Sequence, residues 1–265
     1  MNILFIGDVS GKPGRKTVRK VLDKMKSEYD LDLVIANCEN IAHGRGVTRK
    51  TANELLDAGV DFLTSGDHVF RIESFLEELD DPHFPVIRPA NYPDDIVGRG
   101  YDLIDLGEKG QVLVINLQGL SFMHENIVSC PFRKIDEILE KTKSLNPVAT
   151  IVDFHGEATS DKKALGFYLD GRVTALLGTH THVATADQRV LEKGTAYVTD
   201  VGMVGPQNSV LWVKKEIGIR FQKYPYNIRF EMEESGPMIF NSVLVKVGAN
   251  GFADSIERVD RVVDL

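Results

Sequence analysis

The sequence predicts an α/β protein in which parallel strands come first and antiparallel strands come later. In the first 80 residues, short apolar runs alternate with amphipathic helices, and this alternation is how βαβ units build a parallel sheet. From residue 189 onward, short β-rich runs follow one another with a single predicted helix among them. Together the two parts indicate one mixed sheet, or two sheets packed against each other.

The N-terminal part supplies three βα units. The predicted strands are apolar runs at residues 2–6, 32–37 and 60–64. The helices that follow them cover residues 14–29, the segment from Thr48 to Gly59, and residues 72–79. Thr48 can cap a helix with its side-chain oxygen, and Gly59 can adopt the left-handed conformation that ends one. This order predicts parallel strands whose carboxyl ends lie at the same edge.

The remaining elements are less regular. Further strands are predicted at residues 112–117, 148–154, 173–177, 195–199, 227–231, 239–247 and 255–259, and helices at residues 132–144 and 214–222. No repeat, low-complexity tract or linker divides the chain, so we expect a single domain over residues 1–265.

Composition narrows the functional class. A net charge of −8 disfavours a protein whose main task is to grip nucleic acid through its phosphates, although it permits a small nucleotide bound at a metal. The two cysteines, Cys38 and Cys130, provide no disulfide framework, and Cys38 is expected to be a buried thiol. No segment has the length of a signal peptide's apolar core or of a membrane span. We therefore expect a cytoplasmic enzyme without a membrane partner.

Five predicted strands end in side chains that can bind metal ions. The sequences at these ends are Gly7-Asp8, Asn37-Cys-Glu-Asn40, Ser65-Gly-Asp-His68, Asp153-Phe-His155 and Gly178-Thr-His-Thr-His182. In open α/β sheets, ligands bind outside the carboxyl ends of the strands, so these side chains are expected to converge. The glycines beside them allow the sharp turns that convergence requires.

The most informative of these sequences is the last. His180 and His182 are two residues apart, so on an extended chain both imidazoles point to the same side. Paired imidazoles are good ligands for Zn, Fe, Mn or Ni. Considered alone, such a pair is more often two polar residues in a turn, and Asp8, Glu39 and His68 each have a similar structural explanation. The repetition at five strand ends favours a functional site.

These motifs resemble those of the calcineurin-like metallophosphoesterases, and most closely their YmdB-like branch of bacterial phosphodiesterases. Further stretches extend the resemblance over nearly the whole chain, namely Asn40-Ile-Ala-His-Gly44, Arg88-Pro-Ala-Asn91, Ile115-Asn-Leu-Gln-Gly119, Glu157-Ala-Thr-Ser160 and Lys193-Gly-Thr-Ala-Tyr-Val-Thr-Asp-Val-Gly-Met203. The resemblance implies a four-layer αββα sandwich of two mixed β-sheets flanked by helices. It also implies hydrolysis of cyclic nucleotides, with the 2′,3′-cyclic ones favoured and the 3′,5′-cyclic ones as a further possibility.

The resemblance also implies roles for individual residues. Glu39 would bridge two metal ions, Asp8, Asn40 and His182 would complete one of them, and Asp67, His155 and His180 the other. Fe or Mn is expected, with Zn or Mg as alternatives. Two cations about 3.5–4 Å apart can share a hydroxide for in-line attack on phosphorus. His68 would then protonate the leaving oxygen.

The sequence departs from the family pattern at Asp67. The third motif of the family reads Gly-Asn-His, whereas this chain has Gly-Asp-His, so an anionic oxygen stands where an amide oxygen is expected. Asp8 is followed by Val9 and Ser10 rather than by the Asp-x-His pattern of the wider superfamily, and Asn40 is expected to substitute as a ligand.

Several other features leave alternatives open. His43 and Arg45 could line the substrate phosphate or lie in a solvated glycine-rich loop. Asp153 and Glu157 could orient His155 or cap a helix that starts near Thr159. Trp212 and the pair Tyr224 and Tyr226 could stack on a base, although packing is the commoner role. His83 and His124 have no predicted role.

Two further functions compete with the phosphodiesterase interpretation: a phosphomonoesterase using the same metals, and a metal-containing regulatory or scaffold protein with weak catalysis. The expected partner is a small cyclic nucleotide, without extended nucleic-acid binding. The β-rich C-terminal part is compatible with a homo-oligomer.

Overall fold

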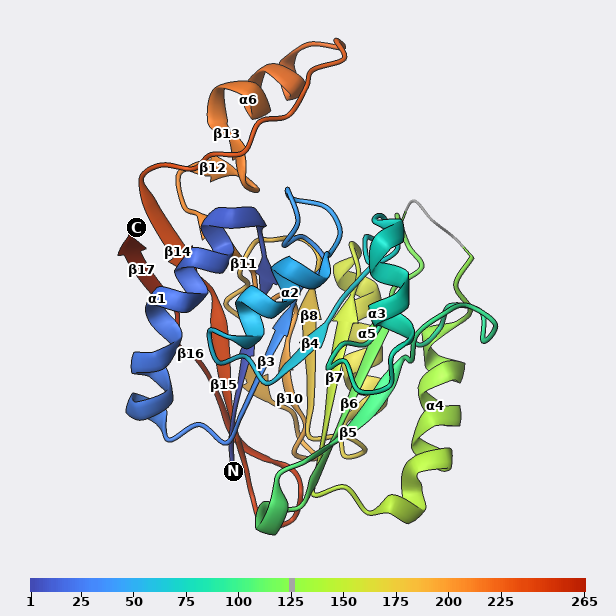
Figure 1. Cartoon of the computed structure of the whole chain (residues 1–265). Coiled ribbons are helices and arrows are strands. Elements are labelled where there is room, and N and C mark those ends of the chain that lie inside the picture. The colour runs from blue at the N-terminus through green and yellow to red at the C-terminus, as the bar shows by residue number, and fades with distance from the viewer. Residues whose placement is uncertain (124–126) are drawn as a thin grey trace.

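The predicted α/β class and four-layer order are confirmed in the computed structural model, which describes residues 1–123 and 127–265 (Figure 1). Two β-sheets lie face to face, and helices cover their outer faces. The first sheet has the order β16-β15-β1-β3-β4 and the second the order β5-β6-β7-β8-β10-β9. Both sheets mix parallel and antiparallel pairs.

The first sheet is built around the N-terminal strand. Its strands are β1 (Asn2–Ile6), β3 (Leu33–Asn37), β4 (Phe62–Thr64), β15 (Ser242–Val247) and β16 (Ala253–Arg258). β1 pairs in parallel with β3, and β3 with β4, as the βαβ pattern predicts. On its other side β1 pairs antiparallel with β15, so the C-terminal part of the chain completes the sheet.

The second sheet has a parallel centre. Its strands are β5 (Tyr101–Asp105), β6 (Gln111–Gln118), β7 (Ala149–His155), β8 (Ala175–Thr179), β9 (Arg189–Val190) and β10 (Ala196–Val198). β6, β7, β8 and β10 run parallel, and β5 and β9 add antiparallel edges. The carboxyl ends of β7 and β8 therefore lie side by side.

Successive side chains of β1 point to opposite faces of the sheet and belong to two different apolar cores. Leu4 and Ile6 face the helix layer, where they join a core that includes Leu22 of α1. Ile3 and Phe5 point to the opposite face and pack with residues of the second sheet. The first helix layer consists of α1 (Gly11–Tyr29), α2 (Arg49–Leu56) and α3 (Leu76–Asp80), and the second of α4 (Pro131–Thr142) and α5 (Thr159–Leu169). Both sheets thus have two buried faces.

A small third sheet supports the site. Its order is β17-β14-β11-β2, with strands β2 (Asp8–Val9), β11 (Met203–Pro206), β14 (Pro237–Phe240) and β17 (Arg261–Asp264). The chain passes from the first sheet to this one at Gly7, between β1 and β2, and also at Asn241, between β14 and β15. The two crossing points are joined by a hydrogen bond of 3.1 Å from the Gly7 amide to the Asn241 carbonyl. A Cβ at residue 7 would lie 1.9 Å from the Gly202 carbonyl oxygen, so only glycine fits there.

Three predicted elements need correction. The single strand expected at 239–247 is two strands in different sheets, because the chain turns at Asn241. The strand expected at 227–231 is wrong, since none of these residues is in a strand. Its last residue, Glu231, accepts one hydrogen bond from the Lys214 amide of β13, and Met232 after it forms an isolated bridge to Val213. The helix at 72–79 begins as a 3₁₀ turn, Glu73–Phe75, before α3.

Other predictions hold within a few residues. α1 begins at Gly11, three residues before the predicted start, because Pro13 is tolerated in the first turn of a helix. Thr48 caps α2 as expected, accepting a hydrogen bond from the Thr51 amide. His124 lies outside the described residues. Within the part of the chain that is described, no helix has the length and apolar character needed to cross a membrane.

An arm projects from the body above the amino end of α1 (Figure 1). It consists of the hairpin β12 (Ser209–Val210) and β13 (Val213–Lys214), followed by α6 (Lys215–Lys223). Trp212 in the hairpin and Phe221 of α6 each contact Phe230 edge to face, so a small aromatic cluster holds the arm together.

Candidate metal centre

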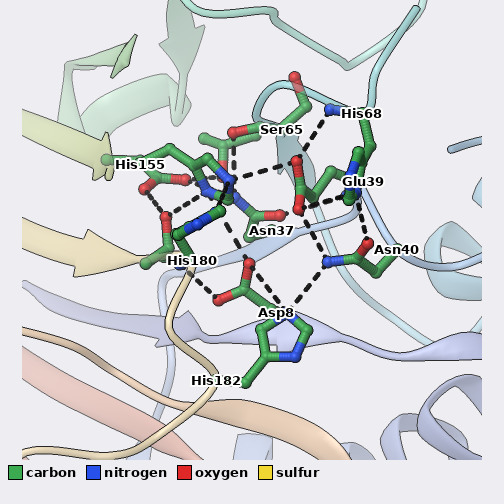
Figure 2. Close-up of polar contacts among 12 residues, drawn as sticks. Asp8, Asn37, Glu39, Asn40, Ser65, His68, His155, His180 and His182 are labelled. Atoms are coloured by element: carbon green, nitrogen blue, oxygen red, sulfur yellow. Dashed lines mark hydrogen bonds and ion pairs between the residues drawn. The ribbon is translucent and has the colours of Figure 1, made fainter. Parts of the chain in front are cut away.

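The structure brings together the predicted ligands from all five strand ends (Figure 2). Asp8 lies in β2, Glu39 and Asn40 follow β3, Asp67 and His68 follow β4, His155 ends β7, and His180 and His182 follow β8. Segments far apart in sequence meet because the parallel strands of both sheets end at the same edge. Asp8, Glu39, Asn40 and His155 are at most 1% exposed, so the inner side of the cluster is shielded from water.

One group of four side chains has the geometry of a metal site. Glu39, Asp67, His155 and His180 each offer an atom to a common region. His155 Nε2 lies 3.2 Å from Glu39 Oε2 and 3.3 Å from Asp67 Oδ1. His180 Nδ1 lies 3.0 Å from His155 Nε2 and 3.8 Å from Asp67 Oδ1. Atoms bonded to one ion at about 2.1 Å are separated by about 3–4 Å, so these side chains fit a metal ion.

A second group shares Glu39 and faces Asp8. It consists of Asp8, Glu39 and His182, and His182 Nε2 lies 4.0 Å from Asp8 Oδ1. The Asn40 amide nitrogen lies 2.8 Å from Glu39 Oε1 and 3.1 Å from His182 Nε2. Ligation by Asn40 requires its amide oxygen at this position, which a half-turn of the amide group provides. The first group contains the residues expected around one ion, and the second contains those expected around the other except Asn40, which lies beside it. That these residues bind metal ions stays a prediction.

Several buried side-chain atoms in the two groups have no hydrogen-bond partner, as expected of atoms that could bind cations. Asp8 Oδ1 and Asp67 Oδ1 are buried and accept no well-directed hydrogen bond, and His182 Nδ1 likewise has none. Buried carboxylates require compensation by positive charge or hydrogen bonds. Asp153 and Asp200 lie behind the ligands and are also fully buried, which adds to the negative charge of the centre. A cation at each group would relieve this repulsion.

Burial and neighbouring charges also shift the pKa values of these side chains. Burial, followed by the nearby charges of Asp200 and Glu39, raises the pKa of Asp8 well above its ordinary value. Burial alone would raise the pKa of Glu39, but the charge and hydrogen bond of His155 outweigh it and lower that pKa. Burial also opposes a charge on His155, yet Glu39 and Asp67 raise its pKa. A proton on His155 therefore offsets carboxylate charge that a metal ion can neutralise instead.

The two histidines that follow β8 are held neutral. Burial, together with the charge of His155, lowers the pKa of His180 to about 4. Burial likewise lowers the pKa of His182. Neutral imidazole is the form that binds metals. Both residues have positive φ angles, 99° for His180 and 64° for His182, a strained conformation that is concentrated at functional sites.

His68 lies against the centre and is partly open to solvent. Its Nδ1 is 3.0 Å from Asn40 Oδ1 and 3.4 Å from Glu39 Oε1, and its Nε2 is 3.6 Å from Asp67 Oδ2. The hydrogen bond and charge of Glu39 outweigh the effect of burial and raise the pKa of His68. His68 lies outside both groups of candidate ligands and has a side chain 20% exposed, as a proton donor to a bound substrate requires.

A layer of contacts behind the ligands orients them. Thr179 Oγ1 lies 2.9 Å from His155 Nδ1 and donates to Asp153 at 2.7 Å, so Asp153 orients His155 through Thr179. Glu157 lies 3.2 Å from His180 Nε2 rather than beside His155. Of the two roles considered for this pair, Asp153 fits the orienting one, and Glu157 acts on a different histidine. Such partners fix the direction in which an imidazole presents its metal-binding nitrogen.

Lys162 and Asp200 form a buried ion pair that sequence reasoning missed. Lys162 Nζ lies 2.7 Å from Asp200 Oδ2 and donates to the Thr179 carbonyl at 2.8 Å. Asp200 also accepts hydrogen bonds from the amide and the hydroxyl of Thr181. The pair thus fixes both neighbours of His180. Asp200 lies within one of the stretches that carry the family resemblance, but Lys162 has no local signal, since it follows an ordinary helical pattern.

A glycine is required at position 66, where the backbone passes close to His155 and Glu39. A Cβ at Gly66 would lie 2.3 Å from His155 Nε2 and 2.4 Å from Glu39 Oε2. Gly66 therefore leaves room for the ligand atoms of the first group.

The structure places His43 and Arg45 in the loop that follows Asn40. Both are exposed, and His43 lines a large cavity next to this loop. The Arg45 side chain makes no hydrogen bond or ion pair with any described residue, which fits the solvated loop.

With this geometry in place, comparisons with known proteins are decisive. A model of the family described as YmdB-like protein matches residues 4–259. The chain belongs to the YmdB-like family. This YmdB-like chain is 42% identical over 248 residues to a Bacillus subtilis protein named 2′,3′-cyclic-nucleotide 2′-phosphodiesterase, covering 93% of the chain and 91% of that relative.

Solved structures agree over the full length. A novel phosphatase from Mycoplasma pneumoniae superposes with a TM-score of 0.92 at 34% identity, covering 100% of this chain and 94% of that one. A hypothetical protein from Thermus thermophilus has a TM-score of 0.90 at 36% identity, covering 99% of both chains. The family resemblance found in the sequence is confirmed, and so is the fold that it implied.

Proposed function

We propose that this YmdB-like protein is a metal-dependent phosphodiesterase that hydrolyses cyclic nucleotides, with 2′,3′-cyclic substrates favoured over 3′,5′-cyclic ones. The proposal rests on one observation above all, namely two ligand groups that share Glu39 at a buried edge of the sheets. The Bacillus subtilis relative named as a 2′,3′-cyclic-nucleotide phosphodiesterase supports the choice of substrate.

We assign the metal ligands by group. Glu39, Asp67, His155 and His180 would hold one ion, and Glu39, Asp8, Asn40 and His182 the other. Imidazole and carboxylate together suit Fe or Mn, and Zn or Mg are the alternatives. When bound, two such cations make water acidic enough to supply a nucleophile at neutral pH and offset the negative charge of the phosphate.

The remaining chemistry belongs to the chain. Attack of a water oxygen on phosphorus forms one P–O bond, and the ester bond to a ribose oxygen breaks on the opposite side. The departing oxygen needs a proton, and the imidazolium of His68 supplies it. The side chain of His68 is 20% exposed beside both groups of candidate ligands, where it can reach the leaving oxygen of a bound substrate. Burial of Glu39 and His155 at no more than 1% exposure keeps bulk water away from the ligand side of the site.

A substrate panel tests the proposal. Purified protein with added Mn²⁺ is assayed on a 2′,3′-cyclic nucleotide, a 3′,5′-cyclic nucleotide and p-nitrophenyl phosphate, and we expect the first to be hydrolysed fastest. Preference for p-nitrophenyl phosphate would instead identify a phosphomonoesterase, a candidate favoured by the likeness to the Mycoplasma phosphatase. Bound metal without turnover of any substrate would identify a regulatory or scaffold protein.

Two variants and a metal analysis test the roles. His68→Ala should lower turnover of the cyclic nucleotide by about 10²–10⁴-fold, the usual contribution of a general acid, while metal content stays unchanged. His83→Ala is the matched control, since His83 is exposed in a loop and contacts no candidate ligand. Elemental analysis should find close to two transition-metal ions per chain. Loss of metal from His68→Ala would make His68 a ligand and place the proton donor elsewhere.

A further inference from the structure

Two hollows that share lining residues lie next to the loop that follows Asn40. The larger, of about 1120 Å³, lies between the amino end of α1, the loop containing His43 and the segment 229–235. The smaller, of about 540 Å³, continues along α1 and α2. Lys12 and Arg15 line both hollows, so the two form one groove. Because a pocket for a single small ligand measures about 300–1,000 Å³, the groove can take more than one nucleotide.

One wall of the groove is strongly basic. The smaller hollow is lined by Lys12, Arg15, Lys16, Arg19, Lys50 and a single carboxylate, Glu54. Arg15 pairs with Glu54 at 2.7 Å. The other four cations have no hydrogen-bond or ion-pair partner among the described side chains. In a chain of net charge −8, four cations without partners in one groove need a reason, and a polyanion supplies one.

The basic wall is attached to the ligand-bearing loop. The first amide of α1, at Gly11, donates to the carbonyl of Asn40 at 2.9 Å. The Arg15 guanidinium donates to the carbonyl of Ile41. His43, three residues after Asn40, lines the larger hollow. The groove therefore lies next to the loop that follows the candidate ligand Asn40, and its smaller hollow runs along α1 and α2.

The facing wall comes from the arm and differs in character. It presents Phe230, whose ring is supported edge to face by Trp212 and Phe221. It also presents two cations, Lys214 and Arg229, and three carboxylates, Glu231, Glu233 and Glu234. Lys214 pairs with Glu231 at 2.9 Å, and the remaining carboxylates favour phosphates on the α1 side. A basic track opposite a supported aromatic ring is the arrangement that binds single-stranded nucleic acid, through phosphate contacts on one side and base stacking on the other.

We propose that the substrate of this site is a short oligoribonucleotide ending in a 2′,3′-cyclic phosphate, rather than a free mononucleotide alone. The inference rests on the proposed phosphodiesterase function. The cyclic end lies at the metal centre, and the preceding phosphates lie along Lys12, Lys16, Arg19 and Lys50, with a base against Phe230. Only RNA carries the 2′-oxygen needed for such an end, so the strand is RNA and not DNA. The same P–O bond is broken as in a mononucleotide.

This inference revises the expectation of no extended nucleic-acid binding. That expectation rested on the net charge of −8, which sums over the whole surface. Phosphates respond to charge within about a Debye length, about 8–10 Å at physiological salt, and the groove is locally basic. The predicted contact is short, because the track has four unpaired cations.

The test compares two substrates and two triple variants of the metal-loaded full chain. The substrates are a 2′,3′-cyclic mononucleotide and a tetraribonucleotide with a 2′,3′-cyclic end. The groove variant carries Lys16→Gln, Arg19→Gln and Lys50→Gln, and the control variant carries Lys24→Gln, Lys143→Gln and Lys163→Gln, which are exposed and lie outside the groove. Both variants lose three positive charges, so the overall charge is matched.

For the wild type at low salt, we expect kcat/KM for the tetranucleotide to exceed that for the mononucleotide by about 10-fold or more. The groove variant should lose most of this advantage and keep its mononucleotide activity, and the control variant should keep both. The advantage should also fall with salt, with a slope that decreases by about 0.7 for each phosphate contact removed. Equal kcat/KM for both substrates in the wild type, or equal losses in the two triple variants, would overturn the inference.

A binding measurement separates this inference from the proposed function. Fluorescence anisotropy with a labelled tetraribonucleotide that ends in a 3′-monophosphate needs no turnover. Binding that the groove variant weakens about 10-fold or more supports the groove even if no cyclic ester is hydrolysed. Hydrolysis of the mononucleotide without such binding leaves the proposed function standing and removes the inference. Equal binding of tetraglutamate or of anionic lipid vesicles would also remove it, because the groove would then not distinguish RNA from other anions.

Discussion

The buried pair of Lys162 and Asp200 provides a sharp test of how the histidine loop is held. Both side chains are 0% exposed, and Nζ lies 2.7 Å from Oδ2. Lys162→Met keeps a side chain of similar length but leaves the Asp200 carboxylate buried without its cation. Removing one partner of a buried pair costs about 3–5 kcal/mol of unfolding free energy. For a protein of this size, that corresponds to a fall in Tm of about 6–20 °C.

Thermal and urea denaturation of the metal-free protein measure this loss directly. Lys163→Met is the matched control, because Lys163 is exposed on the same helix, and it should change the unfolding free energy by less than about 0.5 kcal/mol. Adding Asp200→Asn to Lys162→Met removes the uncompensated charge and should restore more than half of the stability. If Lys162→Met is no more destabilising than Lys163→Met, or if the double variant is worse than the single one, the pair does not hold the loop in the way described.

Three further outcomes are expected. Gly66→Ala should abolish binding of one of two metal ions, as measured by elemental analysis, because the added Cβ occupies the position of ligand atoms. Asp67→Asn should retain both ions and shift the pH–rate profile to lower pH, because one negative charge fewer makes a bound water easier to deprotonate; an unshifted profile would contradict this. Burial raises the pKa of the Cys38 thiol, so a thiol reagent should modify half-buried Cys130 in the native protein and Cys38 only after unfolding.

Much of the candidate ligand set could be predicted from local sequence because each candidate lies at, or a few residues after, the end of an apolar strand. His155 ends β7 and His180 follows β8, and side chains at the ends of neighbouring parallel strands lie side by side. The third sheet could not be predicted in this way. The run from Pro237 to Val247 is continuously β-rich, and only the hydrogen bond between Gly7 and Asn241 shows where it divides.

The ion pair of Lys162 and Asp200 behind the candidate ligands could not be predicted from local sequence either. Lys162 lies in α5 at a position that an amphipathic helix could equally give to an apolar residue, and its partner is 38 residues further along the chain. The basic groove could not be predicted either, since it combines cations from α1 and α2 with an arm that begins only at Ser209. The net charge of the whole chain gives no sign of this local positive charge, because a sum over the sequence carries no positions.

The sequence by itself determined the α/β class, the family and the candidate ligands, because strand periodicity and residue chemistry are local properties of the chain. The tertiary structure alone decided where the chain leaves the first sheet, which atoms approach within 3–4 Å, and which charges remain without partners. Those properties depend on the packing of segments distant in sequence. Packing sets the distances and the burial on which electrostatic energies depend, and no local pattern records either.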